Sequence, residues 1–267
     1  MSAEFARLGV RPGATVLVHA SLRRVGVGPG PVLGALLDAV GPRGTVVVPT
    51  FTAGNSDTSP AYKWETLGMT PAEIAEHRAR MPAFDPDTMA SQGMGRLAEA
   101  VRRSARAVRS AHPQTSFAAI GARARELMAG HDEECHLGER SPLARLEAVR
   151  AQVLLLGVGF EVCSAFHLGE ARVPGVAWRT YGCVVRRGGV RTWVSYEDVA
   201  HDDRDFGELG AAFEADTGVV RRGRVGGGEA ALFPLDAAVA YARTWLAGNR
   251  AHGVSTDPSQ DGACSLH

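Results

Sequence analysis

Residues 14–20, ATVLVHA, form a short apolar run rich in β-branched side chains, directly after the turn pair Pro12-Gly13. This composition predicts a buried strand. Residues 31–40 then carry apolar side chains at helical spacing up to Gly41, and residues 44–49, GTVVVP, repeat the buried-strand pattern. A strand, a helix and a strand in close succession predict a right-handed unit with parallel strands. The chain therefore begins as an α/β fold.

The clearest buried strand further along is QVLLLG at residues 152–157. We expect one α/β domain over residues 1–250, with a central, largely parallel or mixed sheet flanked by helices and an antiparallel C-terminal extension from about Thr180. We expect a disordered tail over residues 251–267. The expected helices cover residues 71–80, 94–108, 122–128, 141–149, 165–171, 206–217 and 235–246, with a weak strand at 118–121 and a hairpin formed by 180–185 and 191–196.

Residues 52–90 interrupt this pattern, because Gly, Asn, Ser, Pro and Asp are frequent and only residues 71–80 have helical spacing. A segment of this length without a core pattern is usually a functional loop or disordered.

The composition of the 267 residues is ordinary for a globular protein, with 45% hydrophobic and 22% charged residues. Lys plus Arg and Asp plus Glu number 29 each, so the net charge is zero, which argues against a nucleic-acid binder. No stretch resembles a signal peptide or reaches the ~20 apolar residues of a membrane span. The cysteines form no CxxC pair. We therefore expect a soluble, cytoplasmic protein with no membrane partner.

Two glycine-containing stretches are candidates for phosphate binding. RRVGVG at residues 23–28 matches the RxxGxG loop with which common N-acetyltransferases hold coenzyme A, but a plain strand-to-helix connection explains it equally well. Gly157-Val158-Gly159 follows a strand but lacks the third glycine of a dinucleotide-binding loop. The absence of GxxxxGK[ST] and GxSxG motifs argues against nucleotide hydrolysis and α/β-hydrolase chemistry.

His167 and Glu170 are the best candidates for acid–base chemistry. They follow the strand at 152–157 by a short loop, which places them at the carboxyl edge of the sheet. On a helix they share a face, and a carboxylate can orient the imidazole and stabilise its charged form. A surface histidine that caps a turn fits the same spacing.

The other histidines and the cysteine nearest His167 give weaker indications. His131 and His136, and the run 201–203 (His-Asp-Asp), match no zinc pattern and indicate solvated loops. His112 precedes a proline in a donor-rich loop that could line a pocket or contact an acyl carrier. Cys163 has apolar neighbours, which favour an inert buried thiol over a nucleophile.

Several motifs, taken in order, resemble the aminoglycoside 3-N-acetyltransferase family, the antibiotic N-acetyltransferases that lie outside the common GNAT fold. The resemblance covers roughly residues 6–247. The matching pieces are VHASL at 18–22 with Val25-Gly26, GTVVVPTF at 44–51, Phe84-Asp85 leading to Met94-Gly95, RSAHP and SFAA within 109–119, and HLGE at 167–170.

The resemblance implies acetyl transfer from acetyl-CoA to the 3-amino group of a 2-deoxystreptamine aminoglycoside, which confers antibiotic resistance. The amine would attack the thioester directly, with His167 as general base and no metal. Glu170 would orient His167, bind substrate ammonium groups, or both, with Asp202 and Asp203 as rival orienting carboxylates. The oxyanion donor stays unassigned. The accepted aminoglycosides, strict N-3 specificity and the choice between monomer and homodimer also stay open.

By similarity, the coenzyme would be held by Ala20, Ser21, Leu22, Val25, Gly26, Arg109, Ser110 and Phe117. The residues expected to bind the aminoglycoside are Asp57, Tyr62, His112, Glu170 and Glu214, since a polycation needs carboxylates in its pocket. One alternative is an acetyl-CoA-dependent N-acyltransferase that acts on a different amine. Another is a binding module for coenzyme A or a metabolite, without catalysis.

Overall fold

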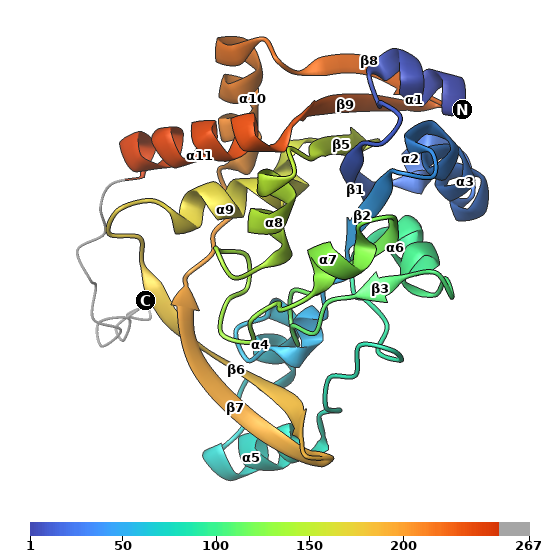
Figure 1. The fold of residues 1–267 in the computed structure, drawn as a ribbon. Coiled ribbons are helices and arrows are strands. Elements are labelled where there is room, and N and C mark those ends of the chain that lie inside the picture. The colour runs from blue at the N-terminus through green and yellow to red at the C-terminus, as the bar shows by residue number, and fades with distance from the viewer. Residues whose placement is uncertain (251–267) are drawn as a thin grey trace, which may run out of the picture.

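A computed structural model describes residues 1–250 (Figure 1). Its main sheet has seven strands in the order β3-β4-β2-β1-β5-β9-β8. The central strands β2, β1 and β5 run parallel, and the outer strands pair antiparallel on both sides. The predicted mixed α/β sheet is therefore confirmed. The strands are β1 Thr15–Ala20, β2 Thr45–Pro49, β3 Val108–Arg109, β4 Phe117–Gly121, β5 Gln152–Leu156, β8 Arg221–Val225 and β9 Gly228–Pro234.

Helices cover both faces of this sheet, which explains why its central strands are continuous apolar runs. Along β1, Val16 and Val18 point to one face and Leu17 to the other, each into a separate cluster of buried side chains. One face carries α1 Ser2–Leu8, α3 Pro29–Val40 and α6 Gly95–Arg102, with the short α2 Leu22–Val25 beside them. The opposite face carries α7 Ala124–Met128, α8 Pro142–Ala148, α9 Ala165–Ala171, α10 Phe206–Thr217 and α11 Leu235–Asn249.

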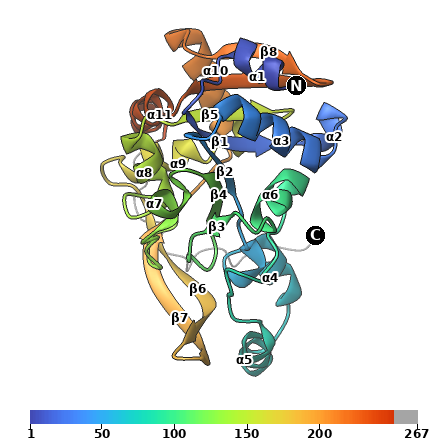
Figure 2. The same cartoon turned by 45° about the vertical axis from the view of Figure 1, so that its right-hand side comes forward.

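A two-stranded antiparallel ribbon, β6 Trp178–Arg187 and β7 Val190–Val199, forms a separate sheet at one end of the molecule (Figure 1, Figure 2). It is longer than the predicted hairpin and includes it. The irregular segment 52–90 folds against it as η1 Ala53–Asn55, α4 Pro60–Glu65 and α5 Pro71–Arg80. The amide of Asn55 exchanges two hydrogen bonds of 2.9 Å with the backbone of Val184, which fixes the ribbon to this segment.

Strands β8 and β9 were absent from the sequence predictions. β8 reads RRGRV and lies at the edge of the sheet, where exposed arginines replace the apolar alternation of a half-buried strand. The helix expected at 94–108 ends earlier, at Arg102. The predicted tail at 251–267 lies outside the described residues. Within residues 1–250, no helix combines the length and apolarity that crossing a membrane requires.

Helix α9 packs closely on α11, and Gly169 makes that approach possible. A Cβ atom at Gly169 would lie 2.6 Å from the backbone oxygen of Val239 and 2.8 Å from the Cβ of Ala242. We expect Gly169→Ala to lower the free energy of unfolding by about 1–3 kcal/mol, because one helix must move away from the other. A urea unfolding curve measures this change.

Gly34→Ala is the matched control. Gly34 lies on the exposed side of α3, where an added Cβ meets no neighbouring heavy atom within 4 Å. This substitution should leave stability unchanged or raise it by up to about 1 kcal/mol. Equal effects of the two substitutions would contradict the importance of the α9–α11 approach.

Candidate active site

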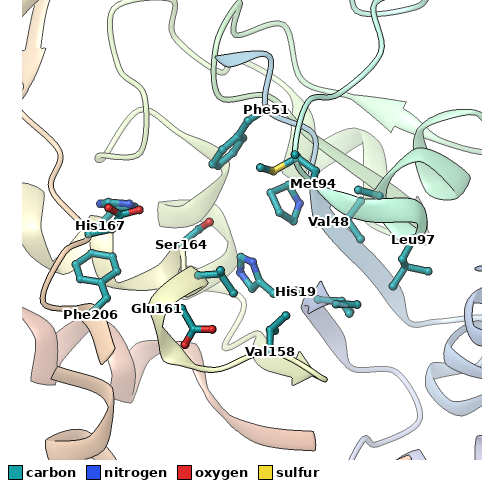
Figure 3. Close-up of a pocket in the computed structure, with 17 residues that line it drawn as sticks. His19, Val48, Phe51, Met94, Leu97, Val158, Glu161, Ser164, His167 and Phe206 are labelled. Atoms are coloured by element: carbon teal, nitrogen blue, oxygen red, sulfur yellow. The ribbon is translucent and has the colours of Figure 1, made fainter. Parts of the chain in front are cut away.

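A cavity of about 240 Å³ opens at the carboxyl ends of the three parallel strands. It is lined by His19 and Ala20 of β1, by Val48 and Pro49 of β2, and by Val158 after β5. β1 pairs in parallel with β2 on one side and with β5 on the other. The space beyond the carboxyl ends of such strands is where open α/β sheets bind ligands. We call it the strand-end cavity (Figure 3).

The walls of the strand-end cavity are mostly apolar. Phe51, Met94, Leu97, Val162 and Phe206 complete the lining with the valines of the strand ends. A few polar side chains interrupt it, namely His19, Glu161, Ser164, His167 and Asp203. An apolar passage with a few converging polar groups is typical of a small-molecule site.

A second cavity, of about 300 Å³, lies between the ribbon and the core, and we call it the ribbon cavity. Phe51, His167 and Asp203 line both cavities. His167 therefore lies where the two cavities meet. The remaining lining of the ribbon cavity is Ala53, Ser56, Thr58, Ser59, Pro60, Gln114, Thr115, His136, Leu137, Arg179, Tyr181 and His201.

His167 and His201 both bind the carboxylate of Glu170. The Nδ1 atom of His167 lies 2.7 Å from Oε2 of Glu170, and Nδ1 of His201 lies 2.8 Å from the same oxygen. The i, i+3 spacing on α9 produces the first contact, and the chain returning from β7 supplies the second. Since Nδ1 of His167 is engaged, its Nε2 is the nitrogen left for a substrate. His201 was not predicted here, because it is near Glu170 only in the folded chain.

Glu170 is a buried, fully paired anion with 1% of its surface exposed. Its Oε1 accepts a hydrogen bond of 3.0 Å from the backbone N–H of Asp202 and another from the guanidinium of Arg250. Burial alone would raise the pKa of Glu170, but the hydrogen bonds from His167 and His201 outweigh it and hold the pKa well below its usual range. Glu170 is therefore an anchor for both rings and has no free oxygen for a substrate ammonium group.

Of the three candidate carboxylates, Glu170, Asp202 and Asp203, Glu170 is the one that contacts His167. The side chain of Asp202 pairs with Arg204 at 2.6 Å, so only its backbone amide reaches Glu170. Asp203 faces the two cavities.

Among residues 1–250, one group of side chains could hold a metal ion, formed by His167, Glu170 and His201 with their ligand atoms within 4.8 Å of one another. Both Nδ1 atoms already bond to Glu170, and the Arg250 guanidinium pairs with the same carboxylate. A cation beside the carboxylate opposes a second one. These residues fit proton transfer better than metal binding.

His131 and His136 were expected in solvated loops, and that expectation is wrong. Both are buried, at 6% and 4% exposed, and their rings pack against His112, with ring centroids 4.7 Å apart in each case. His136 bridges core and ribbon, with Nδ1 2.8 Å from Asp198 of β7 and Nε2 bonded to Gln114. His112 is fully buried, and its Nδ1 accepts hydrogen bonds from the backbone of the following loop. His131 and His136 make hydrogen bonds through both ring nitrogens, which compensates for the burial of these polar loops.

The predicted coenzyme residues of the β1–α2 turn lie beside the strand-end cavity. Ala20 lines it, and Ser21 begins α2. Leu22 and Val25 are buried against the sheet, and Gly26 ends α2 in the left-handed conformation at φ 73°. The side chains of Leu22 and Val25 face the core, so these two residues and Gly26 can offer a ligand only their backbone groups.

Arg109, Ser110 and Phe117 do not line either cavity. The guanidinium of Arg109 donates to the backbone oxygen of Thr50 at 2.8 Å, to the hydroxyl of Ser116 and to the backbone oxygen of Pro86. The hydroxyl of Ser110 accepts from the backbone of Phe117, whose side chain is fully buried in the core. The residues of this motif thus stabilise the pairing of β3 with β4.

Asp57, Tyr62 and Glu214 also stay outside both linings. Asp57 accepts a hydrogen bond of 2.7 Å from Gly182 of the ribbon and lies 3.6 Å from Arg78. The hydroxyl of Tyr62 accepts from the same arginine at 2.7 Å. Glu214 pairs with Arg222 at the β8 edge. Each of these groups already has an arginine partner.

Buried neutral histidines should make the fold sensitive to acid. Burial lowers the pKa of His19 and His201 to about 4 and that of His131 to about 3. The unfolded chain then binds more protons between these values and about pH 6.5, so stability is greatest above pH 6.5 and falls as the pH falls. The lowered pKa of His19 alone should reduce the free energy of unfolding by on the order of 3 kcal/mol between about pH 6.5 and pH 4.

Urea unfolding at about pH 7.5, 6 and 5 tests this, with a midpoint that decreases at each step. His131→Gln should flatten the decrease, because one titrating group is gone. A midpoint that stays constant down to pH 5 would contradict the neutral state of these rings.

Comparison with known proteins gives consistent matches. The family model described as aminoglycoside 3-N-acetyltransferase matches residues 17–247. Aminoglycoside N(3)-acetyltransferase VII of Streptomyces paromomycinus is 37% identical, over 92% of this chain and 90% of its own. The aminoglycoside N(3')-acetyltransferase-like protein YokD of Bacillus subtilis is 34% identical, over 92% of this chain and 91% of its own.

The solved structures agree with these relatives. The crystal structure of YokD has a TM-score of 0.85 and covers 93% of this chain and 97% of that one. AAC-VIa bound to sisomicin has a TM-score of 0.80 at 33% identity, with 92% and 96% covered. AAC-IIIb in a binary complex with CoASH has a TM-score of 0.79 at 30% identity, with 92% and 94% covered.

Proposed function

The chain belongs to the aminoglycoside 3-N-acetyltransferase family, and we propose that it transfers the acetyl group of acetyl-CoA to the 3-amino group of a 2-deoxystreptamine aminoglycoside. The observation that carries this proposal is the position of His167, where the strand-end cavity and the ribbon cavity meet. An enzyme that joins two substrates directly needs a proton acceptor between their two sites. Acetylation of the amine would confer antibiotic resistance.

Acetyl-CoA is the co-substrate of this family, and the strand-end cavity suits its reactive end. An uncharged pantetheine arm and acetyl group match a lining of valines, Phe51, Met94 and Leu97. Ala20 of the β1–α2 turn lines this cavity, and the backbone of the turn, residues 20–26, would hold the phosphates. The solved relative AAC-IIIb in a binary complex with CoASH supports coenzyme A as the co-substrate.

His167 acts as the general base in this proposal. Glu170 fixes its Nδ1, so Nε2 takes the proton from the acceptor amine as the nitrogen attacks the thioester carbon. A tetrahedral oxyanion forms, the carbon–sulfur bond breaks, and the protonated ring returns the proton to the CoA thiolate. The products are the amide and free CoA, and no acyl-enzyme is needed.

One observation favours a second candidate, an N-acyltransferase for a less cationic amine. Among the described residues that line the ribbon cavity, Asp203 is the one carboxylate and Arg179 contributes a positive charge. Asp57 and Glu214 pair with arginines elsewhere. A polycation therefore finds little net negative charge at this cavity.

Thiol release from acetyl-CoA in the presence of gentamicin, kanamycin or neomycin tests the proposed function. We expect release by the wild type and a loss of about 10²–10⁴-fold in kcat for His167→Ala, because the proton acceptor is gone. His77→Ala on α5, outside both cavities, is the control and should keep wild-type activity. Release that survives His167→Ala would exclude His167 as the base. No release with any aminoglycoside, with CoA still bound, would favour the second candidate.

Two charge substitutions separate the candidates. For an aminoglycoside, Asp203→Asn should raise KM by about three- to tenfold, because the cavity loses attraction for a cation. Arg179→Ala should lower KM, because a repelling positive charge is removed. For an amine that carries an acidic group, both changes should reverse. Initial rates at varied acceptor concentration measure them, and an aminoglycoside KM that responds to neither substitution would show that the aminoglycoside does not bind in the ribbon cavity.

A further inference from the structure

His19 is a buried polar side chain without a partner. It lies near the end of β1 with 5% of its surface exposed, beside Leu155 of β5 in the sheet register. Within residues 1–250, its Nε2 atom has no hydrogen-bond partner. An unpaired buried polar atom costs roughly 1–3 kcal/mol, and an apolar residue would fill this place in the sheet without that cost. Stability therefore does not explain why a histidine stands here.

The ring of His19 lines the strand-end cavity together with Ser164 and His167. In the view of Figure 3, Ser164 lies between the two histidines, and Val158 and Met94 flank His19. Because β1 is held between two parallel neighbours, the backbone of His19 is fixed. The ring of His19 is thus a preorganised polar group in the wall of the cavity assigned to the thioester.

His19 and His167 have different surroundings. Burial, with the charge of His167 nearby, lowers the pKa of His19 to about 4, so its ring is neutral near pH 7. Among residues 1–250, no carboxylate bonds to the His19 ring, in contrast to His167 on Glu170. A neutral imidazole that keeps its proton can serve as a hydrogen-bond donor to developing negative charge.

We propose that the ring N–H of His19 donates a hydrogen bond to the thioester carbonyl oxygen of acetyl-CoA and stabilises the oxyanion of the tetrahedral intermediate. This inference rests on the proposed acetyl transfer. When the amine nitrogen attacks, the carbonyl π electrons move to the oxygen, and His19 holds that oxygen without giving up its proton. The electrons return as the carbon–sulfur bond breaks, and proton transfer stays with His167.

Other polar groups of the cavity are weaker candidates for this role. Glu161 and Asp203 are carboxylates, which would repel an oxyanion. The hydroxyl of Ser164 is the rival donor, since this side chain is 5% exposed and makes no cap bond to its helix. Ser164→Ala is therefore the matched comparison.

The test compares His19→Leu, which removes the donor from an apolar site, with His19→Gln, which keeps an N–H donor. We expect kcat to fall by about 10²–10³-fold for His19→Leu, to recover in part for His19→Gln, and to fall less for Ser164→Ala than for His19→Leu. The shape of the pH profile should not change, because His19 transfers no proton. His19→Leu should also unfold at a higher urea concentration than the wild type, which separates lost activity from lost folding.

A binding measurement makes the test independent of turnover. Free CoA lacks the thioester carbonyl of acetyl-CoA, so the Kd of free CoA should be the same for the wild type and His19→Leu. The infrared carbonyl band of acetyl-CoA, labelled with ¹³C at the carbonyl, should lie at lower frequency on the wild type than on His19→Leu.

Wild-type kcat in His19→Leu, an unshifted carbonyl band, or a loss confined to Ser164→Ala would overturn the proposal. Failure of the proposed acetyl transfer has a different signature: the wild type releases no thiol with any amine. The carbonyl band of bound acetyl-CoA would still report on His19 in that case.

Discussion

The side chain of Glu170 joins parts of the chain that are far apart in sequence. One buried carboxylate binds His167 on its own helix, His201 and the Asp202 amide after the ribbon, and Arg250 beyond α11. A charge in this environment is tolerable only while its partners are present, and removing one from a buried pair typically costs about 3–5 kcal/mol. The position of His167 therefore depends on the packing of α9, α11 and the end of the ribbon together.

The sequence predicted the centre of the fold because its information there is local. Buried parallel strands are continuous apolar runs, and the spacing of His167 and Glu170 places both on one helix face. The edge strand β8 escaped prediction because its exposed arginines carry no apolar pattern. His201 escaped because its contact with Glu170 spans 31 residues and exists only after the ribbon has formed.

The surroundings of the candidate substrate and coenzyme residues were likewise not predictable from charge or motif. Sequence gives the type of a residue but not its partner, and the carboxylates of Asp57 and Glu214 are each near an arginine in the folded chain. Phe117 belongs to a motif near the candidate site, yet its side chain is in the core. The buried row of His112, His131 and His136 likewise supports the loop that faces the ribbon, through hydrogen bonds that no spacing rule predicts.

The proposal of direct transfer between two substrates rests on which groups at this site can ionise. Cys163 precedes α9 but is fully buried, and burial raises the pKa of its thiol to about 12, so it offers no thiolate for an acyl-enzyme. The carboxylate of Glu170 is occupied by its donors, and His201 has its Nδ1 on the same oxygen. His167 is then the side chain that is both held in place and open to the two cavities. A site built in this way favours an incoming amine as the nucleophile, with the protein supplying position, a proton acceptor and hydrogen bonds.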